Sequence, residues 1–407
     1  MWMTIKLAWR NLFRNKRRTF IAGTAIGIGL ASLIFTDALM VGMSDHLIHS
    51  ATASFMGEAQ IHREGYRDSR EVSETVNNEG DVMKRLRQDS RVRAVSGRCL
   101  ATGTIASPAE IRPVMMIGAI PEDEARVSQF DDVMASGTFL TGGKMDLVIG
   151  DRLAELLQVG LGDRVVLTVA MSGSGELSQQ LFRVSGIYRF GTREMDDGMA
   201  LVHREVLQKM LGLGDGIHEI AITFRDRSVV ERTDDPFYGT YGTEGNEAVG
   251  WQVLMPQLAM GLRLIDVSML IVGLILFAVV SLGIINTLFM SIYERMFEFG
   301  VLRAVGTRPV QVARLIILEA GVLAVLSIVL GLVLGIVITG IVAHTGIDYR
   351  GIEMMGVTLR EMIYPRFMLV QFWKYPLWVL VMTMLVGIYP ATYAARLVPA
   401  EAMRKSL

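Results

Sequence analysis

The fold is decided by the stretch YERMFEFGVLRAVGTRPVQVAR, Tyr293–Arg314, a charged segment between two long apolar runs. The flanking runs, Leu264–Ser291 and Leu315–Ala343, are each long enough to cross a hydrocarbon core of about 30 Å. Gly306 and Pro309 interrupt the stretch, and we expect Gly306 to end a helix. A polar helix held between two spans can receive a push from a soluble partner. We therefore interpret Tyr293–Arg314 as a cytoplasmic coupling segment.

The composition indicates a mixture of membrane spans and one water-soluble part. Of the 407 residues, 51% are hydrophobic and 20% are charged. Between Met43 and Leu262 there are 22 basic and 32 acidic residues, against 18 and 9 in the rest of the chain. This asymmetry favours an acidic soluble part and basic membrane flanks on opposite sides of a bilayer. The single cysteine, Cys99, excludes an intrachain disulfide framework, and we expect it to be buried.

The chain begins with a predicted cytoplasmic amphipathic helix, residues 1–19, followed by a first span at 20–43. The basic residues before the span place the N-terminus inside. A cleaved signal peptide is the alternative, but the apolar stretch is too long for one. Small residues four apart, Gly23 and Gly27 here and Gly331 and Gly335 in the run Leu315–Ala343, would allow close helix packing. Asp37 lies in the outer third of the span. It either has a function there or lies close enough to the membrane surface to be hydrated.

Residues 44–262 are predicted to form a mixed α/β domain on the outer side of the membrane. Asp146–Val169 has the pattern strand, helix, glycine turn and strand, and Ile217–Phe224 alternates apolar and polar residues. We expect residues 231–250 to be a long exposed loop or hairpin, and the pairs Asp196-Asp197 and Asp234-Asp235 to lie in solvated turns. Nothing in the sequence has the spacing of a catalytic or metal site, so a non-catalytic subunit without a cofactor of its own is expected.

The remaining segments complete a membrane α-helical fold with four transmembrane helices and a large mixed α/β domain on the outer side between the first and second spans. In order, they are the second span with an outer stalk (263–292), the coupling segment (293–314), the third span (315–343), a return segment on the outer side (344–374), the fourth span (375–395) and a cytoplasmic tail (396–407). Both termini are then cytoplasmic. The sequence has no Walker A motif, so ATP binding in the P-loop manner is excluded.

Three cytoplasmic segments, LAWRNLFRNKRRT, YERMFEFGVLRAVGTRPVQVARLIILEA and YPATYAARLVPAEAMR, resemble the FtsX/MacB/LolC-E class of ABC transporter permeases. The segments IGDRLAELLQVGLGDRVVLTV, RFGTREMDDGMALVH and WQVLMPQLAMGLRL are most similar to the lipoprotein-releasing permeases LolC and LolE. The resemblance implies a bacterial inner-membrane protein with a MacB-type periplasmic core. It also implies two copies of a separate ATPase subunit that bind ATP and Mg²⁺, a second permease subunit that is identical or paralogous, and a periplasmic chaperone or adaptor.

The site residues follow from the coupling segment and from this resemblance. For contact with the ATPase we expect Glu294, Arg295, Phe297, Glu298, Phe299, Leu302, Arg303 and Gly306. For a lipoprotein or lipid cargo between the outer halves of the first two spans we expect Phe35, Asp37, Leu39, Met40, Met43, Leu264, Val267, Met269 and Leu270, because methionine adapts well to acyl chains. Plain helix packing is the alternative for the second set. MacB-like efflux of drugs or peptides, and FtsX-like control of a periplasmic hydrolase without transport, remain alternative functions.

Overall fold

The structure is a computed structural model that describes residues 9–11, 14, 16–140, 143–226, 229–230, 232–354, 357–358 and 361–398. Most of the predicted N-terminal amphipathic helix and of the C-terminal tail lie outside these residues. The chain divides into two compact units. The helical unit comprises Met1–Asp45, Arg263–Asp348 and Glu361–Leu407, and the α/β unit comprises His46–Leu262 and Tyr349–Arg360.

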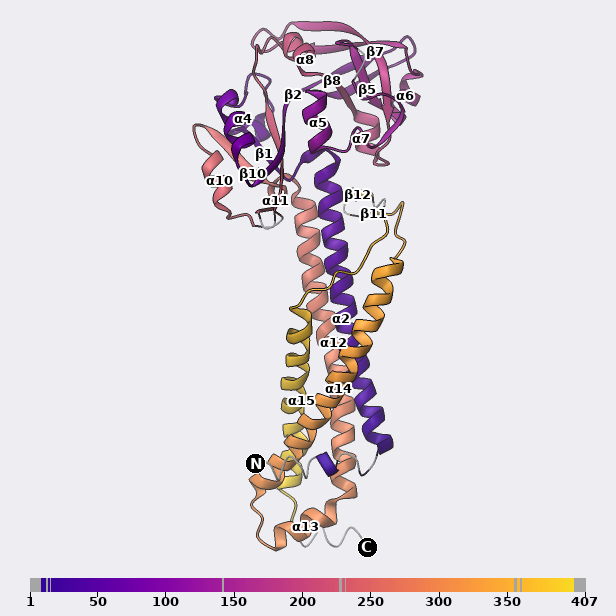
Figure 1. Cartoon of the computed structure of the whole chain (residues 1–407), viewed down its shortest axis with the longest axis vertical. Coiled ribbons are helices and arrows are strands. Elements are labelled where there is room, and N and C mark those ends of the chain that lie inside the picture. Colours follow the sequence, from indigo (N-terminus) through magenta and orange to yellow (C-terminus); the bar gives the residue numbers. More distant parts are fainter. Residues whose placement is uncertain are drawn as a thin grey trace. The chain divides into compact units, whose positions relative to one another are not determined.

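Within the described residues, four helices are long and apolar enough to cross a membrane (Figure 1). They are α2 (Lys16–Ala51), α12 (Pro256–Glu294), α14 (Pro309–Thr345) and α15 (Gln371–Ala395), with the short α13 (Met296–Ala304) between α12 and α14. Each long helix contains one predicted span. Both α2 and α12 continue well beyond the apolar residues, and α12 reaches about 58 Å at a rise of about 1.5 Å for each of its 39 residues.

The close packing of α2 against α14 depends on small residues in both helices. A Cβ atom added to Gly331 would lie 2.7 Å from the carbonyl oxygen of Gly27, and one added to Gly27 would lie 3.2 Å from that of Ser327. Gly335 meets the backbone of Ala31 in the same way. The predicted glycine pairs of the first and third spans therefore face each other, which lets the two backbones approach closely.

Two apolar clusters hold the helical unit together. The first joins α2, α12, α14 and α15 through buried residues such as Ile34, Ile284 and Leu323. The second joins the end of α12 to α13, α14 and α15 through Ile292, Phe299, Val312, Ile316, Ala391 and Ala394. The coupling segment is therefore packed against three long helices and does not form an isolated loop.

The α/β unit contains one mixed ten-stranded sheet with the order β10-β1-β9-β2-β3-β8-β5-β7-β4, and β6 pairs with β2 and β7. The strands are β1 (Ala59–Arg63), β2 (Val92–Ala106), β3 (Ile111–Ala119), β4 (Met134–Gly137), β5 (Asp146–Gly150), β6 (Arg164–Ala170), β7 (Leu177–Tyr188), β8 (Met199–His203), β9 (Glu219–Phe224) and β10 (Asn246–Gly250). The pairs β3–β8 and β5–β7 are parallel and the other pairs are antiparallel. A separate hairpin is formed by β11 (Glu353–Met354) and β12 (Val357–Thr358).

Short helices and one π-helical turn connect these strands. They are the turn Thr52–Met56, α3 (Tyr66–Ser69), α4 (Glu79–Gln88), α5 (Pro121–Val127), α6 (Asp151–Leu157), α7 (Arg193–Gly198), α8 (Arg204–Leu211), α10 (Pro236–Tyr241) and α11 (Trp251–Leu254). The predicted strand–helix–strand pattern of residues 146–169 is confirmed as β5, α6 and β6. The predicted burial of Cys99 is also confirmed, within the apolar cluster that α6 and α8 form with the sheet.

Two predictions for this unit are wrong. Residues 232–250 are not an exposed loop, because α10 buries Phe237 and Tyr241 and β10 pairs with β1. The Asp235 carboxylate caps α10 by accepting a hydrogen bond from the Phe237 amide. Asp196 does not lie in a solvated turn, because its buried carboxylate accepts hydrogen bonds from the amides of Phe190 and Gly191, each at 2.7 Å. Polar composition indicates a loop only where tertiary partners do not satisfy the polar groups.

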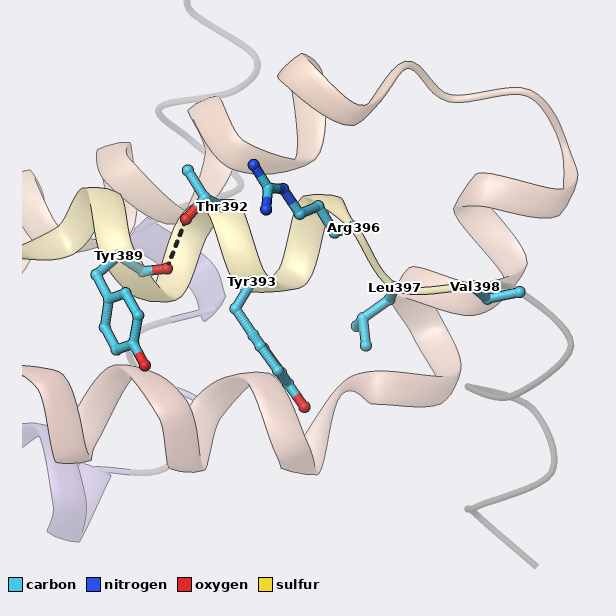
Figure 2. Close-up of a pocket in the computed structure, with 6 residues that line it drawn as sticks. All are labelled: Tyr389, Thr392, Tyr393, Arg396, Leu397 and Val398. Carbon is cyan, nitrogen blue, oxygen red and sulfur yellow. Dashed lines mark hydrogen bonds between the residues drawn. The ribbon is translucent and has the colours of Figure 1, made fainter.

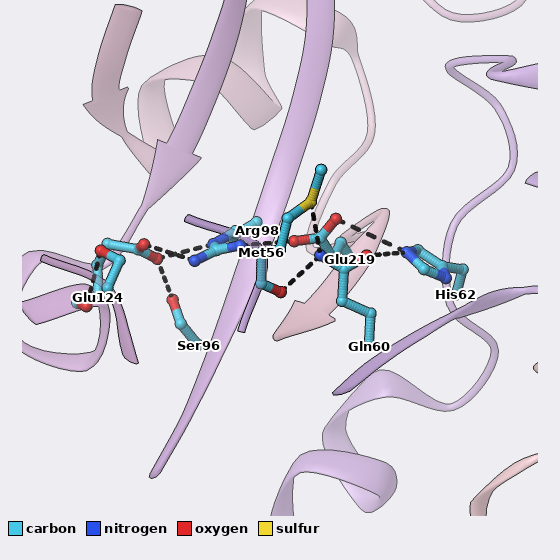
Figure 3. Close-up of polar contacts among 8 residues, drawn as sticks. Met56, Gln60, His62, Ser96, Arg98, Glu124 and Glu219 are labelled. Carbon is cyan, nitrogen blue, oxygen red and sulfur yellow. Dashed lines mark hydrogen bonds and ion pairs between the residues drawn. The ribbon is translucent and has the colours of Figure 1, made fainter. Parts of the chain in front are cut away.

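A fully buried arginine lies at the centre of the α/β unit (Figure 3). The Arg98 guanidinium donates to both Glu124 carboxylate oxygens, at 2.9 and 2.6 Å, and to Glu219 at 2.7 Å. The guanidinium carbon, Cζ, of Arg98 lies 4.3 Å from the centre of the Phe55 ring. Burial lowers the pKa of the Arg98 guanidinium, but the two carboxylates outweigh this effect and the net pKa is raised. The ion pairs therefore keep Arg98 charged in an apolar surrounding.

Candidate coupling site

The α13 helix ends as its sequence predicts. Gly306 has a φ of 99°, in the left-handed region that favours glycine. The Gly306 amide donates to the Arg303 carbonyl oxygen at 3.2 Å, and the Thr307 amide donates to the Leu302 carbonyl oxygen at 3.0 Å. This pair of hydrogen bonds is a Schellman motif. Pro309 then begins α14, so the chain turns sharply between the two helices.

The two faces of α13 differ in their surroundings. Met296 and Phe299 are buried, and Phe299 is 1% exposed. Phe297 and Leu302 on the other face are 51% and 41% exposed, and Val305 just after the helix is 83% exposed. An exposed apolar face flanked by charged residues is a surface typical of a protein contact.

Polar contacts connect α13 and α14 to the N-terminal segment, which we define as residues 9–11 and 14. The Arg295 guanidinium donates to the Glu319 carboxylate at 2.6 Å and to the Glu298 carboxylate at 3.1 Å. The Asn11 amide nitrogen donates to the same Glu319 oxygen at 2.8 Å. Arg14 donates to the second oxygen of Glu298. The five side chains form a continuous series of contacts that begins at Asn11 and ends at Arg14, and we call it the polar ring.

The polar ring combines buried and accessible members. The Arg295 and Glu319 side chains are 9% and 6% exposed, whereas that of Glu298 is 44% exposed. Burial raises the pKa of the Glu298 carboxyl, but the hydrogen bonds from Arg14 and Arg295 outweigh it and the net pKa is lowered. Glu298 therefore stays ionised at neutral pH.

The predicted ATPase contacts fall into two groups. Phe297, Leu302 and the partly exposed Glu298 lie on accessible parts of the coupling segment, and Glu294 pairs with Arg18 at 2.7 Å. Arg295 and Phe299 are instead turned inward, because the carboxylate of Glu319 and the apolar cluster around α14 attract them. Arg303 donates to the Thr307 carbonyl oxygen at 3.2 Å and so supports the turn. A direct contact of Arg295 or Phe299 with a partner is therefore not proposed.

The sequence reasoning overlooked Glu319, although a signal for it was present. Glu319 interrupts the predicted third span in the segment LIILEAG. An ionisable residue inside a span is expensive and is usually paired or functional. We applied this rule to Asp37 in the first span but not to Glu319 in the third.

Asp37 is fully engaged by neutral partners on α15. Its carboxylate accepts hydrogen bonds from the Gln371 amide at 2.8 Å and the Tyr375 hydroxyl at 2.7 Å. Asp45, near the end of the same helix, forms an ion pair with Arg366. These contacts connect α2 to the start of α15, so Asp37 has at least a structural role.

The predicted cargo residues differ in exposure between the two helices. On α2, Met43 is buried, and the half-buried residues are Phe35, Asp37, Leu39 and Met40. On α12, Met269 is half-buried, whereas the exposed residues are Leu264, Val267 and Leu270. The α12 side of the predicted cargo region is therefore the accessible one.

A groove of about 340 Å³ lies at the end of α15 (Figure 2). Its lining residues are Tyr389, Thr392, Tyr393, Arg396, Leu397 and Val398. The rings of Tyr389 and Tyr393 pack edge-on against Phe289 of α12, with centroids 5.4 and 5.3 Å apart. Aromatic residues in this position suit a membrane–water boundary.

Two family models cover most of the chain. The MacB-like periplasmic core domain matches residues 19–236, and the FtsX-like permease C-terminal domain matches residues 270–399. The chain belongs to the FtsX/MacB/LolC family of ABC transporter permeases. The four apolar helices, the mixed α/β unit and the packed α13 are thus the parts of a permease of this family.

Several curated relatives match this permease over most of its length. The LolC lipoprotein-releasing system transmembrane protein of Xylella fastidiosa (strain 9a5c) is 25% identical over 72% of this chain and 73% of the relative. LolE of Haemophilus influenzae is 24% identical over 98% of both chains. The macrolide export ATP-binding/permease protein MacB of Nitrobacter winogradskyi is 24% identical over all of this chain and 61% of the relative.

Among solved structures, the periplasmic region of MacB from Actinobacillus actinomycetemcomitans is 14% identical, with a TM-score of 0.34. That match covers 49% of this permease and 92% of the solved chain. The extracellular domain of the transporter YknZ is 13% identical, with the same TM-score, and covers 47% of this permease and 98% of the solved chain.

Proposed function

We propose that this permease extracts lipoproteins or lipids from the inner membrane, using ATP hydrolysed by a separate subunit. The observation that carries the proposal is the end-to-end similarity to LolE, which spans 98% of both chains, together with the similarity to LolC. In this proposal the α/β unit is periplasmic and both termini are cytoplasmic. The four arginines of Tyr293–Arg314 support that orientation, because basic loops remain inside.

Energy enters, in this proposal, at the exposed face of α13. Phe297, Leu302 and Val305 provide the apolar contact with the ATPase, and Glu294 and Glu298 provide charge at its edge. Two ATPase copies bind ATP and Mg²⁺, and neither is bound by this chain. The arrangement of α13 supports this role, since Phe299 fixes the helix to α14 and α15 while the opposite face stays accessible.

The movement is then carried by α12. This helix is uninterrupted from Pro256 to Glu294 and is followed directly by Arg295 and α13. In the most apolar 18-residue stretch of α12, only 6% is buried within the chain, whereas the corresponding value for the first span is 44%. Such an exposed surface is suited to lipid, to cargo acyl chains and to a second permease subunit, identical or paralogous. A periplasmic chaperone or adaptor would receive the cargo.

The coupling role is tested by co-purification. Leu302→Asp places a charge on the exposed face of α13 and is expected to abolish capture of the ATPase subunit. Leu177→Asp is the matched control, because Leu177 is 70% exposed in the α/β unit and lies outside the coupling segment. Equal ATPase capture by both variants would contradict a docking site on α13.

The cargo is tested by depletion of the permease. Lipoproteins are expected to accumulate in the inner membrane, as measured by membrane fractionation, and the wild-type chain is expected to restore their release. Normal lipoprotein distribution after depletion would rule out the proposed cargo without affecting the assignment as a permease.

The second candidate function is MacB-like efflux of drugs or peptides. It is favoured by the match of the whole chain to MacB and by the MacB-like core model over residues 19–236. Efflux predicts altered drug susceptibility on deletion, with unchanged lipoprotein release. FtsX-like control of a periplasmic hydrolase predicts neither effect and instead a hydrolase bound to the α/β unit.

A further inference from the structure

Glu319 occupies a special position in the polar ring. It is the only ring member on a membrane-spanning helix, and one of its oxygens accepts hydrogen bonds from both Arg295 and Asn11. The two donors come from different places, the residue that precedes α13 and the N-terminal segment. A single carboxylate on α14 therefore joins two segments that are 284 residues apart in the sequence.

The N-terminal segment is attached to the ring at two points. Asn11 contacts Glu319, and Arg14 contacts Glu298, which in turn contacts Arg295. Four residues further along the chain, Arg18 pairs with Glu294. Because the segment is held at both Asn11 and Arg14, it cannot separate from α13 and α14 without breaking the hydrogen bonds to Glu319 and to Glu298.

The burial of Glu319 argues against a merely incidental charge. An exposed ion pair contributes little and needs no fixed geometry. A buried carboxylate requires full pairing, and replacing a whole buried ion pair by apolar residues of similar volume is often neutral or stabilising. Such pairs are best explained where they fix the register of one element against another.

We propose that Glu319 is a positioning residue that holds the N-terminal segment and α13 as one body. The inference rests on the proposed function in so far as the ATPase docks on α13. A push on α13 would then reach α2 through the N-terminal segment and α14 through Glu319 at the same time. Two helices would respond together, in addition to the directly connected α12.

The test uses the full-length chain alone, with spin labels at Arg10→Cys and Val305→Cys. Cys99 stays in place, because it is buried and burial raises the pKa of its thiol to about 12, which makes it unreactive toward the label. Pulsed electron–electron resonance is expected to give a single narrow distance in the chain that retains Glu319. Glu319→Leu is expected to abolish that narrow distance and give a broad distribution.

Three further variants keep the test decisive. Glu319→Gln retains an acceptor oxygen and is expected to keep the narrow distance. Asn11→Leu opens the ring from the other side and is expected to broaden the distance even if Glu319→Leu does not fold. Asp37→Asn changes the other intramembrane carboxylate considered above, and the distance is expected to stay narrow. A narrow distance in both Glu319→Leu and Asn11→Leu would overturn the proposal.

A second readout separates this inference from the proposed function. In the assembled transporter, Glu319→Leu is expected to hydrolyse ATP with loss of cargo movement, and an unchanged ratio of hydrolysis to release would contradict the positioning role. The distance measurement needs neither ATPase nor cargo. The positioning role of Glu319 can therefore be tested independently of what the permease transports.

Discussion

Arg98 of the α/β unit and Arg295 of the helical unit have similar neighbours, but those neighbours differ in their exposure to solvent. Each arginine contacts two glutamates, and each guanidinium lies over a phenylalanine ring, at 4.3 Å for Arg98 and 5.0 Å for Arg295. Both glutamates of Arg98 are buried, whereas Arg295 has one buried and one largely accessible glutamate.

This difference separates a core contact from a movable one. Every close partner of Arg98 belongs to the α/β unit, on β9, on α5 or in the turn Thr52–Met56, so the cluster can only break when the unit unfolds. Arg295 lies between two helices and a segment near the N-terminus, and water reaches one of its carboxylates. The same chemical groups therefore specify a rigid fold in one region and a relation between movable elements in the other.

The largest effect is expected for Arg98→Met. This change leaves Glu124 and Glu219 buried without their charged partner, and breaking such a pair costs about 3–5 kcal/mol. We expect the α/β unit to lose cooperative unfolding in a thermal melt of the purified chain. Arg93→Met is the matched control, since Arg93 is exposed on the same strand. A similar stability of the two variants would remove the structural role of the cluster.

A smaller loss of stability with a larger loss of coupling is expected for Arg295→Met. The change removes the charged partner of Glu319 and leaves it only the neutral donor Asn11, and the lost hydrogen bond to a buried charged group costs about 1–3 kcal/mol. Transport per ATP hydrolysed is expected to fall further than the melting temperature suggests. The double variant Arg295→Met/Glu319→Leu is expected to recover stability without recovering coupling. Recovery of both would show that the ion pair is only structural.

An intermediate, pH-dependent effect is expected from His218. Its Nδ1 atom accepts a hydrogen bond from the Leu100 amide and its Nε2 atom contacts the Val72 carbonyl oxygen, both at 2.9 Å, which suits the neutral ring. Burial lowers the pKa of His218 below its ordinary value of 6.5. The stabilisation is therefore complete above pH 6.5 and is lost as the pH falls below it.

Thermal melts at a series of pH values between about 7.5 and 5.5 measure this loss, because this range lies on both sides of the ordinary histidine pKa of about 6.5. The stability of the α/β unit is expected to decrease over this range in the wild-type chain. His218→Gln is expected to be less stable at neutral pH and less dependent on pH. An equal pH dependence in the two chains would assign the effect to another group.

The smallest effect on stability is expected for the charge exchange Arg14→Glu with Glu298→Arg. This outer contact of the ring is accessible to solvent, and exposed ion pairs contribute little to stability. Arg14→Glu is expected to melt like the wild-type chain but to weaken transport. Glu298→Arg also removes a partner of Arg295, so it is expected to melt at a lower temperature and to weaken transport as well. The exchange is expected to restore part of the transport. Unaltered transport in both single variants would show that the ring functions without its outer contact.

The sequence alone determined that the chain has four apolar helices long enough to span a membrane, with a charged segment between the second and third. Hydrophobic runs of sufficient length have few alternatives, and Gly306 and Pro309 punctuate the backbone locally. It also indicated the glycine pairs of α2 and α14, because small residues four apart lie on one helix face.

The tertiary structure decided which side chains of the coupling segment face a partner and which face the protein. In the sequence, Arg295 and Phe299 cannot be told apart from their charged and apolar neighbours. In the structure they point into the protein, because Arg295 pairs with Glu319 and Phe299 packs in the cluster around α14. The ordered α10 and β10 and the buried Asp196 likewise depend on partners distant in the sequence. Polar groups are placed by whatever satisfies their charge and hydrogen bonds, and only the folded chain brings those partners together.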